Sequence, residues 1–192
     1  SEQGWDEMTI QHRFAALKRD LPPAPSPIGT FRNVMQVGNL LYVAGQGPID
    51  RDGRLQTGKV GREVSVDMAY QHARLTGLNI LSVLDAHLGE LGRIKRFVKL
   101  LGFVNATDGF EDHARVINGC SDLLVELFGE RGVHARSSIG VASLPNNISV
   151  EVEAIVEILP EGTNIGAGAP TSPKRGTINR SASAWACVPS ST

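Results

Sequence analysis

The chain has 192 residues, 41% of them hydrophobic, and a formal net charge of -1 at pH 7. This length suits one globular domain with a sizeable core, and the near-neutral charge argues against nucleic acid, which is bound through a basic face. No run approaches the roughly 18 apolar residues of a membrane span, and the N-terminus has no signal-peptide pattern. The two cysteines, Cys120 and Cys187, form no disulfide framework. We therefore expect a soluble protein of a reducing compartment, the cytoplasm or alternatively the mitochondrion.

Residues 1–24 are expected to form an N-terminal extension. Apolar residues recur over residues 5–18 at spacings typical of a short amphipathic helix. Four prolines follow in residues 21–27. Because proline fixes φ and lacks a backbone N–H, this stretch predicts an extended connector.

Two short apolar runs, residues 34–37 and 40–44, flank Gly38-Asn39. This dipeptide is a two-residue turn signal, so the pattern predicts a β-hairpin. The second strand runs into Gly45-Gln46-Gly47. Two glycines at a strand end allow close approach by a ligand or another chain, or simply a bend.

Two helices and one further strand follow. Ser65 is a suitable N-cap and Gly89 a suitable stop for the first helix. Residues 94–104 form a mostly apolar run, typical of a strand that is buried on both faces. Asp108, with Glu111 three residues later, resembles a capping box and predicts that the second helix begins there.

The last two predicted strands are residues 138–144 and 148–158. The second run alternates with a period of two, and acidic residues occupy one of its faces. The connection between the runs is too short for a crossover, so we expect an antiparallel hairpin. This hairpin would bring Arg136 toward the far half of the last strand, next to Glu151 or Glu157 according to the register.

The predicted order is ββαβαββ, in which a strand–helix–strand unit occurs twice. This order favours an α+β fold with a mixed sheet and both helices on one face. Ile155 lies among the acids of the uncovered face, so we expect an oligomer whose sheets face inward. Residues 161–192 are rich in Gly, Ala, Ser, Thr and Pro and are expected to form a flexible tail.

A few residues could carry chemistry. Arg136 could bind a carboxylate through two parallel hydrogen bonds, and a surface ion pair is the alternative. Glu151 could orient or deprotonate a water molecule, and a solvated strand face is the alternative. Asn118-Gly119 interrupts the second helix pattern, either for close packing or for a kink that places Asn118 at a site. The five histidines lack metal-ligand spacing, so no metal is expected.

Three motifs resemble the signature of the reactive intermediate deaminases, the Rid or YjgF-like proteins often labelled endoribonuclease L-PSP. They are Arg-Ser-Ser at 136–138, Val-Ala-Ser-Leu-Pro at 141–145 and Val-Glu-Val-Glu-Ala at 150–154. Further similarity lies at residues 27–29, 38–40, 44–46 and 99–105. Residues 25–160 are thus the expected Rid-like domain. The N-terminal extension and residues 116–119 resemble a longer-chain branch of the family.

The resemblance implies a chorismate-mutase-like (ferredoxin-like) fold and a homotrimer whose sheets line a central barrel. It implies three ligand sites between subunits, each for a small imine or keto acid that bears a carboxylate. The implied activity is hydrolysis of reactive enamine or imine intermediates, such as 2-aminoacrylate, to a 2-keto acid and ammonia. No metal or organic cofactor is implied.

The resemblance also implies roles for single residues. Arg136 matches the arginine that grips the substrate carboxylate, and Glu151 matches the acid beside the attacking water. Gly45 matches the glycine whose backbone meets the imine, and Asn118 matches a site asparagine.

Three positions depart from the family pattern. Phe31 stands where many members have tyrosine, Ala44 replaces a common serine, and Ser138 replaces a common cysteine. The alternative function is a non-catalytic trimer that binds a small metabolite or a protein. A ribonuclease or translation inhibitor is a weaker reading, because the sequence offers no acid–base histidine pair and no basic stripe.

Overall fold

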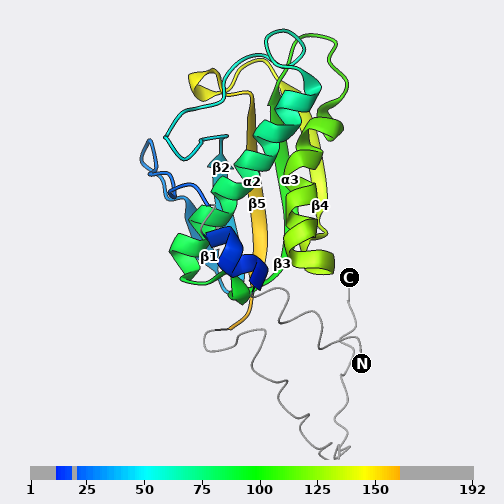
Figure 1. Cartoon of the computed structure of the whole chain (residues 1–192). Helices are drawn as coiled ribbons and strands as arrows, with labels where there is room; N and C mark the ends of the chain where they lie inside the picture. Colours follow the sequence, from blue (N-terminus) through cyan, green and yellow to red (C-terminus); the bar gives the residue numbers. More distant parts are fainter. Residues whose placement is uncertain (1–11, 19–20, 161–192) are drawn as a thin grey trace, which may run out of the picture.

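The computed structural model describes residues 12–18 and 21–160. In chain order its elements are β1 (Val34–Val37), β2 (Leu40–Gln46), α2 (Val66–Leu88), η1 (Leu91–Arg93), β3 (Ile94–Asn105), α3 (His113–Phe128), η2 (Gly129–Gly132), β4 (Ala135–Val141), η3 (Pro145–Asn147) and β5 (Val150–Ile158). The order ββαβαββ is confirmed, and both long helices lie on one face of the sheet (Figure 1).

The five strands form one mixed sheet in the order β1-β2-β5-β3-β4. The predicted β1–β2 hairpin is confirmed. The predicted hairpin between the last two strands is wrong, because β4 pairs in parallel with β3, and β5 pairs antiparallel with both β3 and β2. Figure 1 shows β5 inside the sheet and β4 at its edge.

The reason for this difference is that β3 takes a neighbour on each side. A helical crossover joins parallel strands, and α3 joins β3 to β4 in this way. Strand β4 also ends earlier than predicted, so residues 142–149 form the connection to β5. Because β3 lies between them, β4 and β5 are two strand spacings apart, which is only about 10 Å. The connection is long enough to cross the end of β3.

The predicted ends of α2 are confirmed. The Ser65 hydroxyl accepts a hydrogen bond from the Met68 backbone N–H, and Gly89 ends the helix in the left-handed region. The predicted capping box of α3 is wrong: the helix begins after Asp112, whose side chain makes no capping hydrogen bond. Gly109 has a φ of 77° and puts a turn where the sequence predicts the first helical residues.

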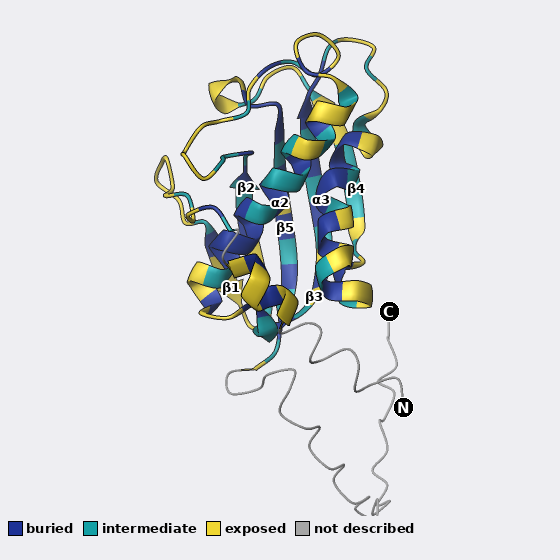
Figure 2. Cartoon of the chain, in the orientation of Figure 1, coloured by how far each residue is buried: buried dark blue, intermediate teal, exposed yellow. Residues whose placement is uncertain are grey.

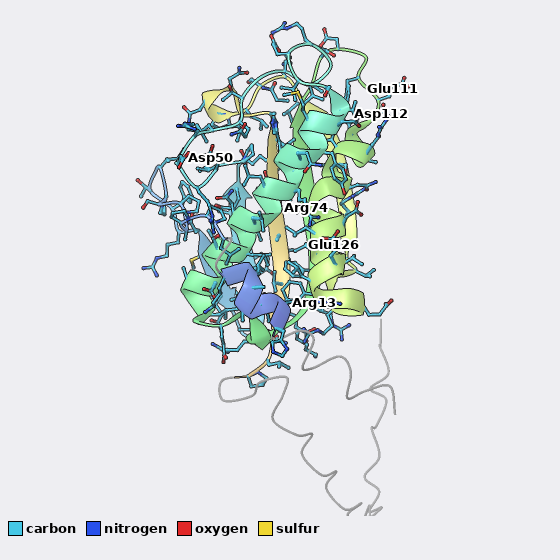
Figure 3. The ribbon with its side chains drawn as sticks, viewed as in Figure 1. Arg13, Asp50, Arg74, Glu111, Asp112 and Glu126 are labelled. Carbon is cyan, nitrogen blue, oxygen red and sulfur yellow. The ribbon has the colours of Figure 1, made fainter. Side chains whose placement is uncertain are left out.

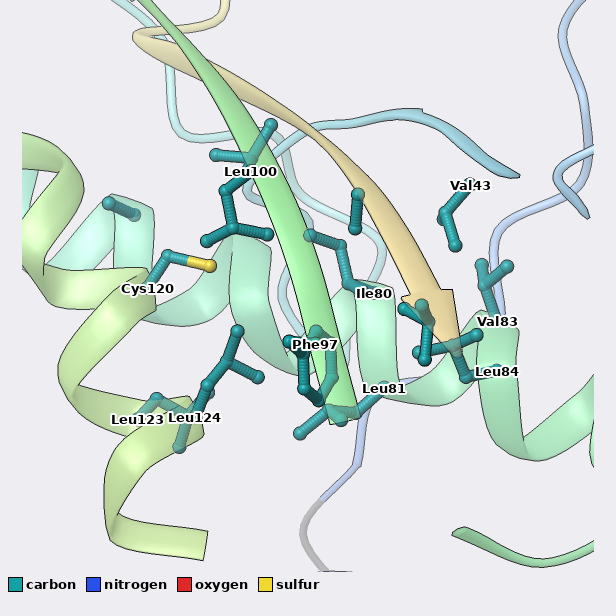
Figure 4. Packing of buried hydrophobic residues seen from close by; sticks show 14 of the residues in the cluster. Val43, Ile80, Leu81, Val83, Leu84, Phe97, Leu100, Cys120, Leu123 and Leu124 are labelled. Carbon is teal, nitrogen blue, oxygen red and sulfur yellow. The ribbon is translucent and has the colours of Figure 1, made fainter. Parts of the chain in front are cut away.

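The core lies between the sheet and the two long helices. Figure 2 shows the buried sides of α2 and α3 turned toward the strands and their exposed sides turned outward. Figure 4 shows the packing at close range, with fully buried side chains from α2, β3 and α3 in contact, among them Ile80, Leu84, Phe97, Leu100 and Leu124.

Residues 12–18 form a short helix that packs on the long helices. The ring centroids of Phe14 and Phe128 are 5.0 Å apart. Arg13 Nη1 donates to the Glu126 carbonyl at 2.9 Å, and Arg74 pairs with the Glu126 carboxylate at 2.5 Å (Figure 3). The earlier part of the predicted N-terminal helix and the tail, residues 161–192, lie outside the described residues.

The sheet face opposite the helices carries exposed apolar side chains, which no described element covers. Met35 and Tyr42 are 54% and 45% exposed. A cavity of about 490 Å³ lies on this face, with Leu101, Ile155 and Ala44 among its lining residues. We call this surface the open sheet face.

Candidate active site

Three of the predicted site residues meet at one cavity. Phe31, Gly45 and Glu151 all line a hollow of about 280 Å³. The loop that carries Phe31 is held by Asn33, whose side-chain amide donates to the Pro25 carbonyl at 2.6 Å. Apolar residues supply much of the remaining wall, namely Pro25, Ile28, Ile49, Leu55, Pro145 and Ile148.

Gly45 fits this site because of its small size. The pairing of β2 with β5 shifts register between Val43 and Gln46, which marks a bulge at this point of the strand. A Cβ atom at position 45 would collide with the Glu151 carboxyl. The bulge and the glycine together bring the β2 backbone against that carboxyl.

Glu151 is half-buried beside the cavity. Burial raises the pKa of the Glu151 carboxyl, and the charge of Glu153 adds to the rise. Among the described residues, no hydrogen bond or ion pair engages this carboxyl group. It is therefore available to a ligand or a water molecule.

Arg136 occupies a different site, between edge strand β4 and helix α3. Its Nη1 donates to Asn118 Oδ1 at 2.8 Å and to Ser121 Oγ at 2.9 Å, and its Nη2 donates to the Ala114 carbonyl at 3.3 Å. These bonds take three of the five N–H donors of a guanidinium. Within the described part of the chain, the Nε–H and one N–H of Nη2 stay available, and such a pair of adjacent donors suits one carboxylate.

Two residues that the sequence alone does not single out complete this arginine site. Ser121 Oγ lies 3.0 Å from His134 Nε2, and His134 Nδ1 lies 2.6 Å from the Gly132 carbonyl oxygen. A signal for both exists in the spacing. Ser121 is three residues after Asn118 on a helix, and His134, just before β4, is two residues before Arg136 and therefore points to the same side of the extended chain.

The other predicted positions lie as follows. Asn118 contacts Arg136, and the helix around it is continuous, so no kink places it there. Ser138 also lies on β4, and its hydroxyl is buried without a hydrogen-bond partner among the described residues. Ala44 lines the cavity of the open sheet face and not the cavity beside Glu151.

Within one chain, Arg136 and Glu151 do not come together. Arg136 pairs with the buried Leu100 of β3 and contacts α3, so it lies on the helix face. Glu151 alternates with the buried Val150 and Val152 and therefore lies on the opposite face. The sequence leaves Glu151 and Glu157 open as neighbours of Arg136, and the single chain provides neither.

Glu157 has a structural role at the far end of β5. Its carboxylate pairs with Lys95 at 2.7 Å and Arg96 at 3.2 Å, and it accepts a hydrogen bond from Asn39. These contacts lower the pKa of Glu157, chiefly through the Lys95 hydrogen bond. Of the two acids that the sequence leaves open as neighbours of Arg136, Glu151 is therefore the one whose carboxyl has no such contact among the described residues.

The part of the chain that the structure describes contains neither a cluster of metal-binding side chains nor a membrane-spanning helix. There, His, Cys, Asp and Glu side chains do not gather in groups of three or more that could hold a metal ion. Over the same residues, every helix is too short or too polar to cross a membrane.

The chain is thus an α+β protein with two candidate half-sites on opposite faces of its sheet, one around Arg136 and one at the Glu151 cavity. Residues 11–158 match the family described as "YjgF/chorismate_mutase-like, putative endoribonuclease". The chain belongs to this YjgF, or Rid, family, as the sequence motifs indicate.

Known proteins agree with this assignment. Protein TCP17 of Trypanosoma cruzi is 41% identical over 72% of this chain and 87% of its own length. A protein of Dermatophagoides farinae, named 2-iminobutanoate/2-iminopropanoate deaminase, is 30% identical over 71% of this chain and 92% of its own. A solved structure from Agrobacterium tumefaciens, of unknown function, is 42% identical and covers 81% of this chain and 97% of its own, with a TM-score of 0.70.

Proposed function

We propose that the protein is a deaminase that hydrolyses 2-imino acids, and their enamine forms such as 2-aminoacrylate, to 2-keto acids and ammonia. The observation that carries the proposal is a cavity in which the Glu151 carboxyl lies against the Gly45 backbone and has no hydrogen bond or ion pair to the described residues. A relative that is 30% identical over 92% of its length is named as such a deaminase, and this supports the choice of reaction.

The two half-sites suggest how the active site is assembled. In a homotrimer with sheets facing inward, β4 of one protomer would border the Glu151 cavity of the next protomer. The exposed apolar residues of the open sheet face favour such an assembly, since patches of this kind mark association surfaces. Each site would then contain Arg136 from one chain and Glu151 from its neighbour.

The reaction would proceed mainly by positioning. Arg136 binds the substrate carboxylate through its two available N–H groups, and the Gly45 backbone contacts the imine nitrogen. Glu151 takes a proton from a water molecule while the water oxygen attacks the imine carbon. Glu151 then gives this proton to the nitrogen of the carbinolamine, the C–N bond breaks to release ammonia, and the hydroxyl proton passes back to Glu151 as the C=O bond of the keto acid forms.

The setting of Glu151 suits this role. A general base works best when its pKa lies near the working pH. Because burial raises the pKa of Glu151, its carboxylate accepts a proton more readily than an exposed glutamate does. Phe31 has no hydroxyl to share this task, so proton transfer falls to Glu151 and water.

A coupled assay tests the proposal. A pyridoxal-phosphate dehydratase generates 2-aminoacrylate or 2-aminocrotonate, and keto-acid release is followed with the wild type and with Arg136→Ala. We expect the wild type to accelerate keto-acid release. The rate with Arg136→Ala should be lower by about 30-fold or more, because the substrate carboxylate loses a charged partner in a desolvated site. The control is Arg62→Ala, which removes an exposed arginine paired with Glu63 and should keep full activity.

The same assay separates the deaminase from a binding protein. If the wild type binds 2-oxobutanoate but accelerates neither imine, the protein is a small-metabolite binder with the same arginine. If Arg136→Ala is as active as the wild type, the assigned carboxylate site is wrong.

A further inference from the structure

Arg136 is linked to His134 through a single hydroxyl group. Ser121 Oγ lies 2.9 Å from Arg136 Nη1 and 3.0 Å from His134 Nε2, and His134 Nδ1 lies 2.6 Å from the Gly132 carbonyl oxygen. The chain of contacts thus runs from the guanidinium on β4, through α3, to the turn η2.

The direction of every hydrogen bond in this chain follows by elimination. A carbonyl oxygen only accepts, so the proton of the neutral His134 ring lies on Nδ1 and Nε2 is an acceptor. A guanidinium only donates, so Ser121 Oγ accepts from Arg136. The Ser121 hydroxyl must therefore donate its proton to His134 Nε2.

The neutral state of His134 is supported by its surroundings. The ring is half-buried, and burial lowers the pKa of His134. The hydrogen bond to the Gly132 carbonyl partly opposes this, and the charge of Arg136 adds a smaller decrease. At neutral pH the ring is therefore an acceptor for Ser121. The hydroxyl cannot rotate away without losing this acceptor, and its lone pair stays aimed at Arg136.

We propose that His134, acting through Ser121, is a positioning residue that fixes the Arg136 guanidinium for a substrate carboxylate. This inference rests on the proposed function of Arg136 and deepens it. Asn118 and Ser121 together hold both N–H groups of Nη1. Nη2 donates to the Ala114 carbonyl, so among the described residues the Nε–H and one N–H of Nη2 remain for a substrate carboxylate.

Two substitutions of His134 separate this role from a structural one. In His134→Asn, the side-chain amide can still donate to the Gly132 carbonyl but does not reach Ser121. In His134→Gln, the longer side chain can accept from Ser121 but lacks a donor at the Nδ1 position. If His134 only stabilises η2, His134→Asn should bind ligand like the wild type. If His134 positions Arg136, His134→Gln should do so instead.

The experiment measures 2-oxobutanoate binding by calorimetry, and kcat and KM in the coupled assay, on the full chain. We expect His134→Gln to stay within about twofold of the wild type. His134→Asn and Ser121→Ala should weaken binding and raise KM on the order of tenfold, with kcat nearly unchanged, because the lost contact serves substrate and transition state alike. The double variant Ser121→Ala/His134→Asn should be no weaker than either single variant, because the two residues act as one unit.

The outcomes distinguish this inference from the proposed function. Equal Kd values for 2-oxobutanoate across the variants, or weak binding by His134→Gln with normal binding by His134→Asn, overturn the positioning role even if imines are hydrolysed. The expected pattern of Kd values without any hydrolysis supports the positioning role and overturns the deaminase. A wild type that binds no 2-oxobutanoate overturns the positioning role.

Discussion

Arg136 and Glu151 lie in different chemical settings, and each setting predicts how the residue responds to substitution. Arg136 is held by three hydrogen bonds on the helix face. Glu151 is half-buried without such bonds among the described residues, and its charged form is disfavoured. The hydrogen bonds of Arg136 fix the orientation of its guanidinium, whereas burial of Glu151 changes the pKa of its carboxyl.

Glu151→Gln should make the folded protein more stable at neutral pH. Because burial raises the pKa of Glu151 above 4.5, ionisation of this group costs more free energy in the folded state than in the unfolded chain. The gain from glutamine should thus be present above the folded pKa and disappear as the pH falls below 4.5, where both states bind the proton. Thermal melts from pH 4 to pH 8 measure this difference.

Exposed Glu111 gives the control. Glu111→Gln should change the melting temperature little across the same pH range. If Glu151→Gln melts at the wild-type temperature at pH 8, burial does not raise the free energy of the ionised Glu151 carboxyl in the folded protein. In the coupled assay, Glu151→Gln should lose about 100-fold or more in kcat if Glu151 is the general base.

Arg136→Lys should keep the charge and still weaken substrate binding. A lysine ammonium cannot donate to Asn118 and Ser121 and also offer two adjacent donors to one carboxylate. We expect KM to rise on the order of tenfold relative to the wild type, and to stay below that of Arg136→Ala. A lysine variant with wild-type KM would mean that only the charge matters at this position.

Part of the candidate site can be predicted from the sequence. Arg136, Glu151 and Gly45 stand in motifs whose residue order is visible in one dimension. Ser121 and His134 are harder to find, because their contacts with the arginine exist only once α3 lies over β4. The separation of Arg136 from Glu151 is hidden for the same reason, since it depends on which strand lies between them.

At the scale of elements, the sequence predicts strands and helices better than it predicts which strands pair. Alternation in β5 shows which side chains share a face, and this prediction is confirmed by its burial pattern. Alternation does not show which strand is the neighbour. The choice between a β4–β5 hairpin and a strand inserted between them is decided by β3, which needs partners on both edges.

The contact between α2 and α3 depends on glycine. A Cβ atom at position 119 would collide with the Tyr70 carbonyl oxygen and would lie 3.0 Å from the Arg74 backbone nitrogen. The packing interpretation of Asn118-Gly119 is therefore confirmed. Gly119→Ala should destabilise the fold by about 1–3 kcal/mol through overpacking, although alanine is the better helix former.

Chemical denaturation measures this effect. Gly92→Ala is the matched control, because a Cβ there meets no atom within 4 Å. It should change the free energy of unfolding by less than about 0.5 kcal/mol. Equal stability of the two variants would contradict the close helix contact.

At the scale of the whole molecule, the open sheet face predicts self-association. Tyr42 is 45% exposed on this face in the single chain. Tyr42→Glu should therefore fold, and should dissociate the proposed trimer with loss of deaminase activity. Sedimentation at micromolar concentration measures the change in mass.

The control for that experiment lies on the opposite side of the molecule. Val125 is 42% exposed on α3, and Val125→Glu should leave the assembly intact. A wild type that sediments as a monomer would remove the shared site and with it the proposed arrangement of Arg136 and Glu151.

The most direct test of the shared site mixes two inactive variants. Arg136→Ala retains Glu151, and Glu151→Gln retains Arg136. In a cyclic trimer whose sites lie between neighbours, equal amounts of the two chains, unfolded and refolded together, give intact sites at about one interface in four. We expect the coupled assay then to recover about a quarter of the wild-type activity. If the mixture stays as inactive as its parts although mixed trimers have formed, the two residues do not meet between subunits and the proposed active site is wrong.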